Sequence, residues 1–200
     1  MHHPQKLSAF TAAAVATAAL LTASPATAQL RATSDDTGDV WMLDEHNIYS
    51  PVEAGRVNVD VVRSTVRHSD RRVKAWVRYD DLVRNTDTAT SAVRLRTSAK
   101  RTYLLQLTTG PGNRRGTVVF GRYTSDGFVD VDCKSIRKAV RYGKNRLVVS
   151  VGRACLKRPR WVRYGGEAVA IEEGPGTTYT DALLGGDPVN DLFSRRIRRG

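Results

Sequence analysis

The chain has 200 residues, and its 32 Lys and Arg against 20 Asp and Glu give a formal charge of +12. This length predicts one domain with a sizeable core, and the charge favours acidic polymers as partners. No stretch after residue 28 approaches the ~20 apolar residues of a membrane span, which excludes a transmembrane protein after cleavage. Arginine supplies 25 of the cations in a chain rich in Ala, Val and Gly, a composition typical of a GC-rich genome, which weakens arginine abundance as a sign of binding.

Residues 1–28 are typical of a secretory signal peptide. A mildly cationic start with Lys6 precedes an alanine-rich apolar run from Leu7 to Ala23 and the small-residue triplet 26–28. We expect cleavage before Gln29 and a secreted, extracellular protein of charge +11, since Lys6 is the only charged residue removed. A retained membrane anchor is the alternative.

From Val57 onward, apolar residues recur at every second position, which predicts β-strands. Val57, Val59 and Val61 alternate before the phase slips, so we expect a bulge near Val61. A polar turn at 68–71 predicts a hairpin with the next strand. Further strands are predicted at 73–79, 92–98, 102–109, 116–123, 127–133, 146–151, 161–164 and 167–171.

Turn-forming residues at 110–113, 125–127 and 143–145 separate these strands. Only short helical turns are expected, at 80–83, 135–140 and 153–156. Seven to nine short strands predict an all-β antiparallel β-sandwich of the jelly-roll or immunoglobulin-like kind, with a closed barrel as the alternative. We assign residues 29–185 to this domain and 186–200 to a flexible basic tail.

Cys133 and Cys155 are the only cysteines, and in an exported chain they are predicted to form one disulfide. Closing a loop of this length stabilises a fold by roughly 3 kcal/mol in the chain-entropy model. A metal site is the rival interpretation. It lacks ligands, because His46 and His68 are the only histidines after residue 28 and neither stands at ligand spacing from a cysteine.

Three short segments resemble a family of exported, uncharacterised β-sandwich proteins. They are the D-x-x-G-D segment at 35–39, the V-D-V to V-R-H stretch at 59–68, and R-x-C-L-x-x-P-x-x-V-R at 153–163, where Gly152 stands in place of the family's proline. The resemblance implies a sandwich and no established activity. More distantly, the chain is similar to DOMON-like and carbohydrate-binding sandwiches, whose haem-binding members use Met and His ligands. Met42 is the only methionine after residue 28.

The segment 151–166 carries five cations around Cys155, Trp161 and Tyr164. Interleaved cations and rings suit a polyanion site. Strand alternation, however, puts Trp161 and Tyr164 on opposite faces, so they make no common stacking platform. We favour a structural corner built around the disulfide.

A basic stripe around Trp76 is the stronger binding candidate. Lys74, Trp76 and Arg78 share one face of their predicted strand, and Arg63 and Arg67 have the same period on its hairpin partner. A third strand could add Arg94 and Arg96. A large ring among arginines suits a sugar that carries sulfate, phosphate or carboxylate groups. The alternative is an outer sheet face with a partly covered tryptophan.

Asp35, Asp36 and Asp39 form an acidic loop in which Gly38 allows a sharp turn. Carboxylate oxygens suit calcium, the one cofactor that the sequence suggests, and Asp44 or the distant Asp181 could add ligands. An ordinary turn is the alternative, because the spacing is not that of an EF-hand.

No nucleophile elbow, zinc-protease motif or phosphate-binding glycine loop occurs, and nothing selects a catalytic pair from Asp60, Asp80, Asp130 and Asp132. We expect no enzymatic activity and no specific nucleic-acid binding. The sequence predicts a secreted, non-catalytic β-sandwich that binds carbohydrate or an anionic cell-surface polymer. The alternative is a structural or protein-interaction domain of the cell envelope.

Overall fold

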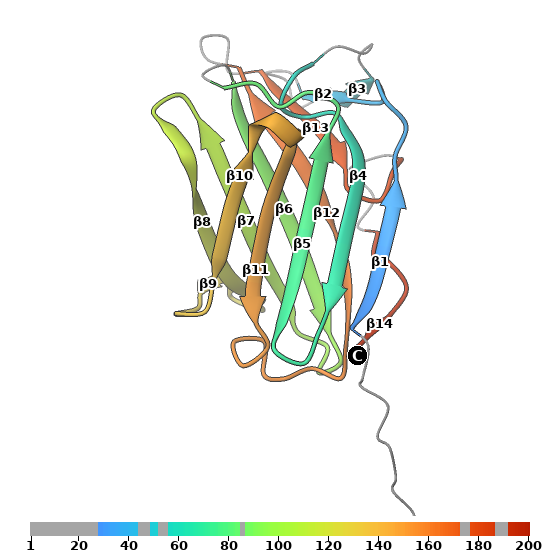
Figure 1. The fold of residues 1–200 in the computed structure, drawn as a ribbon, viewed down its shortest axis with the longest axis vertical. Helices are drawn as coiled ribbons and strands as arrows, with labels where there is room; N and C mark the ends of the chain where they lie inside the picture. The colour runs from blue at the N-terminus through green and yellow to red at the C-terminus, as the bar shows by residue number, and fades with distance from the viewer. Residues whose placement is uncertain (1–27, 44–48, 52–55, 85–86, 173–176, 187–191) are drawn as a thin grey trace, which may run out of the picture.

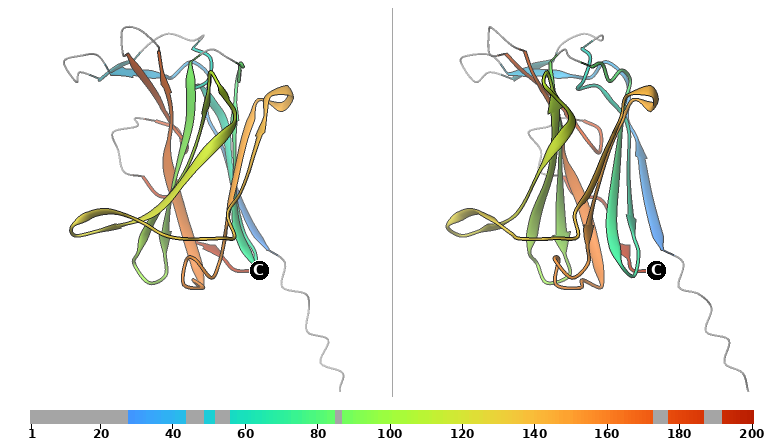
Figure 2. Two further views of the ribbon diagram at one scale, coloured as in Figure 1. Left: turned by 90° about the vertical axis from the view of Figure 1, so that its left-hand side faces the viewer. Right: turned by 60° about the vertical axis from the view of Figure 1, so that its left-hand side comes forward.

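Two antiparallel sheets pack face to face in the computed structural model (Figures 1 and 2). The structure describes residues 28–43, 49–51, 56–84, 87–172, 177–186 and 192–200. The predicted signal peptide up to residue 27, Asp44 and His46 lie outside the described residues. The prediction of an all-β antiparallel sandwich is confirmed.

The two sheets contain five and nine strands. The five-stranded sheet has the order β1 (Gln29–Ser34), β4 (Val61–His68), β5 (Arg72–Tyr79), β11 (Arg146–Gly152) and β10 (Arg137–Arg141). The nine-stranded sheet has the order β3 (Tyr49–Pro51), β2 (Trp41–Leu43), β13 (Thr178–Ala182), β12 (Trp161–Ile171), β6 (Thr88–Thr97), β7 (Thr102–Gly110), β8 (Asn113–Thr124) and β9 (Gly127–Asp130), with β14 (Ile197–Arg198) beside β12.

The core lies between the two sheets because every second side chain of the central strands points inward. In β5, buried residues alternate with less buried ones along the whole strand, and β7 repeats the pattern. Burying one such aliphatic side chain contributes about 1.5–3 kcal/mol. The core also holds Tyr164, whose hydroxyl lies 2.9 Å from Thr33 Oγ1 and 3.0 Å from Ser64 Oγ. These contacts tie strands of both sheets together.

Strand β4 begins later than the alternation predicts. Residues 57–59 form a turn in which Asn58 has a φ of +69°, a left-handed conformation that asparagine tolerates. Its buried amide donates to Asp87 O at 3.0 Å and accepts from Val83 N at 2.7 Å. The expected bulge is confirmed, since the register between β4 and β5 shifts between Val61 and Arg63.

Strand β12 is continuous where the sequence predicts two strands interrupted at Gly165 and Gly166. Both glycines stay in the strand because other backbone approaches them closely. A Cβ on Gly165 would lie 2.0 Å from Leu192 O, and one on Gly166 would lie 1.9 Å from Ala92 O. The pair of glycines therefore permits close packing rather than a turn.

One predicted helical turn, 135–140, is wrong, because residues 137–141 form β10. The helical element within the described residues is the three-residue 3₁₀ turn Tyr142–Lys144. The described part of the chain contains no helix long and apolar enough to span a membrane.

Residues 192–200, which lie within the segment 186–200 expected to be a flexible basic tail, pack on the domain. Ile197 is buried and pairs with Val162 of β12, and Ser194 accepts a hydrogen bond from Tyr164 N at 3.0 Å. Arg198 N also donates to Gln29 Oε1, which brings β14 beside the start of β1. The apolar Ile197 explains the difference, since it gives an otherwise basic segment a residue to bury.

The predicted disulfide between Cys133 and Cys155 is present, with the two Cα atoms 5.9 Å apart. It joins the segment after β9 to the turn after β11, where Leu156 is buried. Arg153 donates to Asp70 O at 2.8 Å and to Pro159 O at 3.1 Å, so its hydrogen bonds stabilise the corner. The structure thus supports the structural interpretation of 151–166, and the disulfide points to an oxidising compartment.

Candidate functional site

The outward side chains of the five-stranded sheet form three rows across its strands. The strand registers place Ser34, Arg63, Arg78, Arg146 and Arg141 in the first row, Ala32, Thr65, Trp76, Val148 and Ala139 in the second, and Leu30, Arg67, Lys74, Ser150 and Arg137 in the third. None of these residues is acidic. The face is therefore basic along two rows and apolar or small between them.

Four residues of the first row, which we name the arginine row, stand directly opposite one another: Arg63, Arg78, Arg146 and Arg141. Neighbouring strands lie about 4.8 Å apart, so the guanidinium groups share a narrow band of surface. Like charges on directly opposed residues destabilise a sheet. An anion lying along the row would relieve this repulsion.

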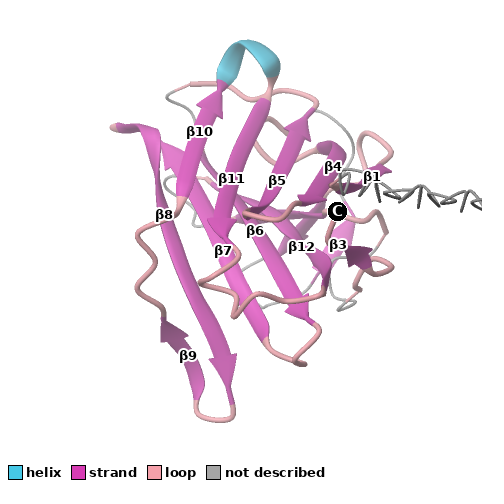
Figure 3. Ribbon diagram, turned by 60° about the horizontal axis from the view of Figure 1, so that its bottom comes forward, coloured by secondary structure: helices cyan, strands magenta, loops and turns pink. Residues whose placement is uncertain are grey.

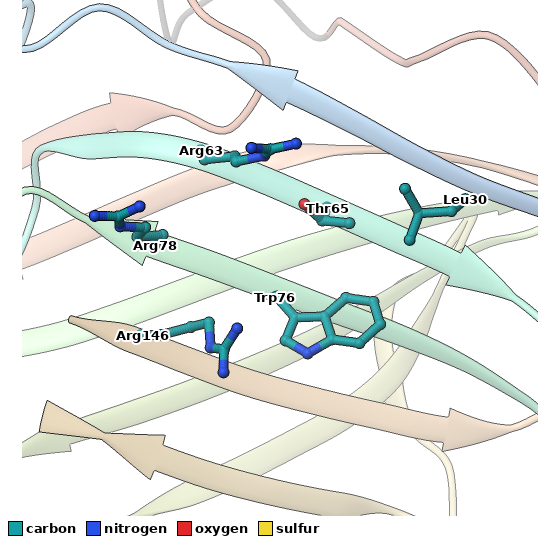
Figure 4. Close-up of a pocket in the computed structure, with 6 residues that line it drawn as sticks. All are labelled: Leu30, Arg63, Thr65, Trp76, Arg78 and Arg146. Atoms are coloured by element: carbon teal, nitrogen blue, oxygen red, sulfur yellow. The ribbon is translucent and has the colours of Figure 1, made fainter. Parts of the chain in front are cut away.

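Trp76 occupies the centre of the middle row, and its ring is only partly covered. A groove of about 450 Å³ follows this part of the face and is lined by Leu30, Arg63, Thr65, Trp76, Arg78 and Arg146 (Figure 4). Figure 4 shows the indole lying along the face between the arginines and Leu30. Lys74 Nζ lies 4.7 Å from the Trp76 ring centroid and adds a cation–π contact.

The structure brings together five of the seven predicted ligand-binding residues. Arg63 stands opposite Arg78, and Arg67 stands opposite Lys74, so the two strands are neighbours as the hairpin prediction required. Arg67 and Lys74 belong to the third row and do not line the groove.

Arg94 and Arg96 are not part of this face. They lie on β6 in the nine-stranded sheet, where Arg94 pairs with Gly165 and Arg96 with Arg163. The Arg94 guanidinium carbon lies 6.0 Å from the Phe193 ring centroid. The prediction failed because the shared spacing of basic residues on three strands does not tell which sheet the third strand joins.

Arg141 and Arg146, together with Leu30, were not predicted. Arg141 and Arg146 face each other across the turn between β10 and β11. Treating 137–141 as a strand would have revealed the alternation Arg137, Ala139, Arg141. Leu30 lies in β1, whose sequence carries no alternating apolar pattern.

The fold separates the three aspartates of the predicted acidic loop. Asp36 is exposed, whereas Asp39 places one carboxylate oxygen within 4.8 Å of oxygens of both Asp60 and Asp181. Asp35 lies close enough to raise the pKa of Asp181. Asp181, weighed as a distant contributor in the sequence, therefore does join the loop, and Asp60 replaces Asp36.

Burial shifts the protonation of these acids. Desolvation, reinforced by the Asp39 carboxylate, raises the pKa of Asp35 to about 7. Desolvation also raises the pKa of Asp181 to about 8, with further contributions from Asp35 and Asp39. The pKa of Asp60 moves in the same direction for the same cause. These pKa values are raised because the carboxylates lie close together and away from water.

Compared with protein-family models, curated proteins and solved structures, the chain matches none. The part of the family resemblance that the structure supports is the architecture, an antiparallel two-sheet sandwich with one disulfide.

Proposed function

We propose that this protein is a secreted, non-catalytic binding domain whose ligand is an anionic polysaccharide of the cell surface. The observation that carries the proposal is the arginine row beside a partly exposed Trp76 along one groove. The guanidinium fork matches carboxylate, sulfate and phosphate groups in pairs of hydrogen bonds. The indole face suits the apolar side of a sugar ring.

The shape of the face favours a polymer over a small anion. The arginine row crosses four strands, and its members repeat at the strand spacing. Repeated acidic sugars along a chain can contact several guanidinium groups at once, whereas a single anion contacts one or two. The groove is open to solvent, which suits a chain that continues beyond it.

Binding to polygalacturonate and dextran sulfate tests the proposal, with uncharged dextran as the reference polymer. The wild-type protein is expected to bind the two acidic polymers in a salt-sensitive manner. Trp76→Ala and Arg78→Gln are each expected to weaken binding about tenfold, because the first removes a ring contact and the second removes a charged hydrogen bond. Isothermal titration calorimetry measures the change.

Arg115→Gln is the matched control, since it removes one exposed charge at the start of β8, outside the groove. It is expected to retain wild-type affinity, and circular dichroism checks that all variants are folded. If Trp76→Ala and Arg78→Gln bind as tightly as Arg115→Gln, attraction is due to net charge alone and the proposal fails.

The β8–β9 hairpin favours a second function, self-association. It extends away from the two layers (Figures 2 and 3), and Tyr123, Phe128 and Val129 are 40–48% exposed on it. Strand β9 is also an edge of its sheet, a site where strands of two copies can pair.

Light scattering after size exclusion tests this second function. A concentration-dependent dimer is expected, and Val129→Lys should reduce it by placing a charge on the edge strand. A wild-type protein that stays monomeric throughout a concentration series excludes the hairpin as a self-association site.

A further inference from the structure

Three carboxylates from distant parts of the sequence meet at one end of the sandwich. Asp39 lies between β1 and β2, Asp60 directly precedes β4, and Asp181 lies in β13. One ligand oxygen of each lies within 4.8 Å of the others. Since β4 belongs to one sheet and β2 and β13 to the other, the cluster sits where the two sheets meet.

Backbone amides hold two of these carboxylates in position. Gly38 N donates to Asp60 Oδ2 at 2.9 Å, and Val61 N donates to Asp181 Oδ2 at 2.6 Å. Each amide fixes one oxygen and leaves the second free to take another partner. Fixing ligand orientation through neighbouring hydrogen bonds is a feature of protein metal sites.

The second oxygens of these carboxylates lack partners among the described residues. Asp181 is 0% exposed and Asp60 is 4% exposed, yet Oδ1 of each has no hydrogen bond to any residue that the structure describes. Asp39 Oδ1 and Asp35 Oδ2 are likewise buried without one. Buried carboxylate oxygens without a partner are costly, and a fold normally satisfies them. Several in one cluster indicate a shared partner that is not a protein group.

Within the described parts of the chain, no basic side chain forms an ion pair with the cluster. The ion pairs found among the described residues join Arg56 to Glu172 and Arg199 to Asp70, and neither includes a cluster carboxylate. The charged groups that act on Asp181 are the carboxylates of Asp35, Asp39 and Asp60. The chain has 31 basic residues after residue 28, so basic side chains are abundant. None of those described pairs with a carboxylate of this cluster, which is consistent with a bound cation.

We propose that Asp39, Asp60 and Asp181 bind a calcium ion, with Asp35 beside them as a further carboxylate. Calcium takes six to eight oxygen ligands at about 2.3–2.6 Å, so oxygens on opposite sides of the ion stand about 4.6–5.2 Å apart. Ligand oxygens that all lie within 4.8 Å of one another are close enough to share one such ion. The all-oxygen ligand set differs from that of structural zinc sites, which are built from Cys and His. This cation site is independent of polysaccharide binding.

Thermal unfolding of the chelator-treated full chain tests the proposal. Added CaCl₂ is expected to raise the midpoint by roughly 5–10 °C at saturation, since an ion that binds only the folded state stabilises it. Isothermal titration calorimetry should show one site. No heat of binding and no midpoint shift with calcium would overturn the proposal, and an equal response to MgCl₂ would overturn the assignment to calcium.

Asp181→Asn and Asp60→Asn locate the site. Each keeps the size of the side chain and removes a carboxylate that can bind the ion, so each should abolish the calcium response while the midpoint in chelator stays the same or rises. Asp126→Asn, in the exposed turn between β8 and β9, is the matched control and should keep the full response. If a buried variant fails to fold, Asp39→Asn, which is only partly buried, takes its place. A full calcium response in these cluster variants would refute the assignment.

Discussion

His68 is fully buried at the end of β4, where a charged group is disfavoured. Its Nδ1 lies 3.1 Å from Ile197 O, so the neutral ring carries its proton on Nδ1 and donates it there, while Nε2 has no partner in the part of the chain that the structure describes. Burial lowers the pKa of His68 against the opposing effect of its hydrogen bond to Ile197 O, and the cations of Arg153 and Arg199 lower it further. The folded protein therefore holds His68 neutral at a pH where the unfolded chain protonates it.

We predict that His68 makes the protein less stable in mild acid. Its contribution is fully present above the ordinary pKa of 6.5 and is lost as the pH falls from there toward the lowered value. Urea unfolding at pH 7, 6 and 5 measures the free energy of unfolding. His68→Asn keeps a donor near the Nδ1 position and cannot titrate, so its curve should fall less. Parallel curves for the two proteins would contradict this assignment.

Strand β14 shows how a short element joins the C-terminal segment to the start of β1. It has two residues, yet it pairs with β12 and contacts Gln29 through Arg198. It also supplies the Ile197 carbonyl oxygen that accepts the hydrogen bond from His68. Ile197 is its buried residue, at 1% exposure. The strand is held by side-chain burial at one position more than by its few ladder hydrogen bonds.

We predict that Ile197→Ala lowers the free energy of unfolding by about 2–5 kcal/mol, the range found when a buried isoleucine is truncated. Urea denaturation measures it. Arg198→Ala, on the neighbouring exposed residue, should change stability by no more than about 0.5 kcal/mol. Equal effects of the two substitutions would mean that the end of the chain does not pack as described.

At the scale of the whole molecule, local patterns predicted the sandwich, the β4–β5 hairpin and five residues of the basic face. Alternation around Trp76 is a local property, so the sequence reveals which side chains share a face. Strand β10 was missed because its residues are exposed or half-buried and lack a strong apolar alternation. The Asp39–Asp60–Asp181 cluster could not be found as a set, because its members meet only where the two sheets pack together.

The wide separation of these three aspartates along the chain has a consequence for folding kinetics. A contact between residues so far apart closes a long loop, so we infer that the cluster forms late, after most strands have paired. Interactions that form after the transition state act mainly on the rate of unfolding. An ion held by Asp39, Asp60 and Asp181 would therefore prolong the lifetime of the folded protein while leaving its rate of folding nearly unchanged.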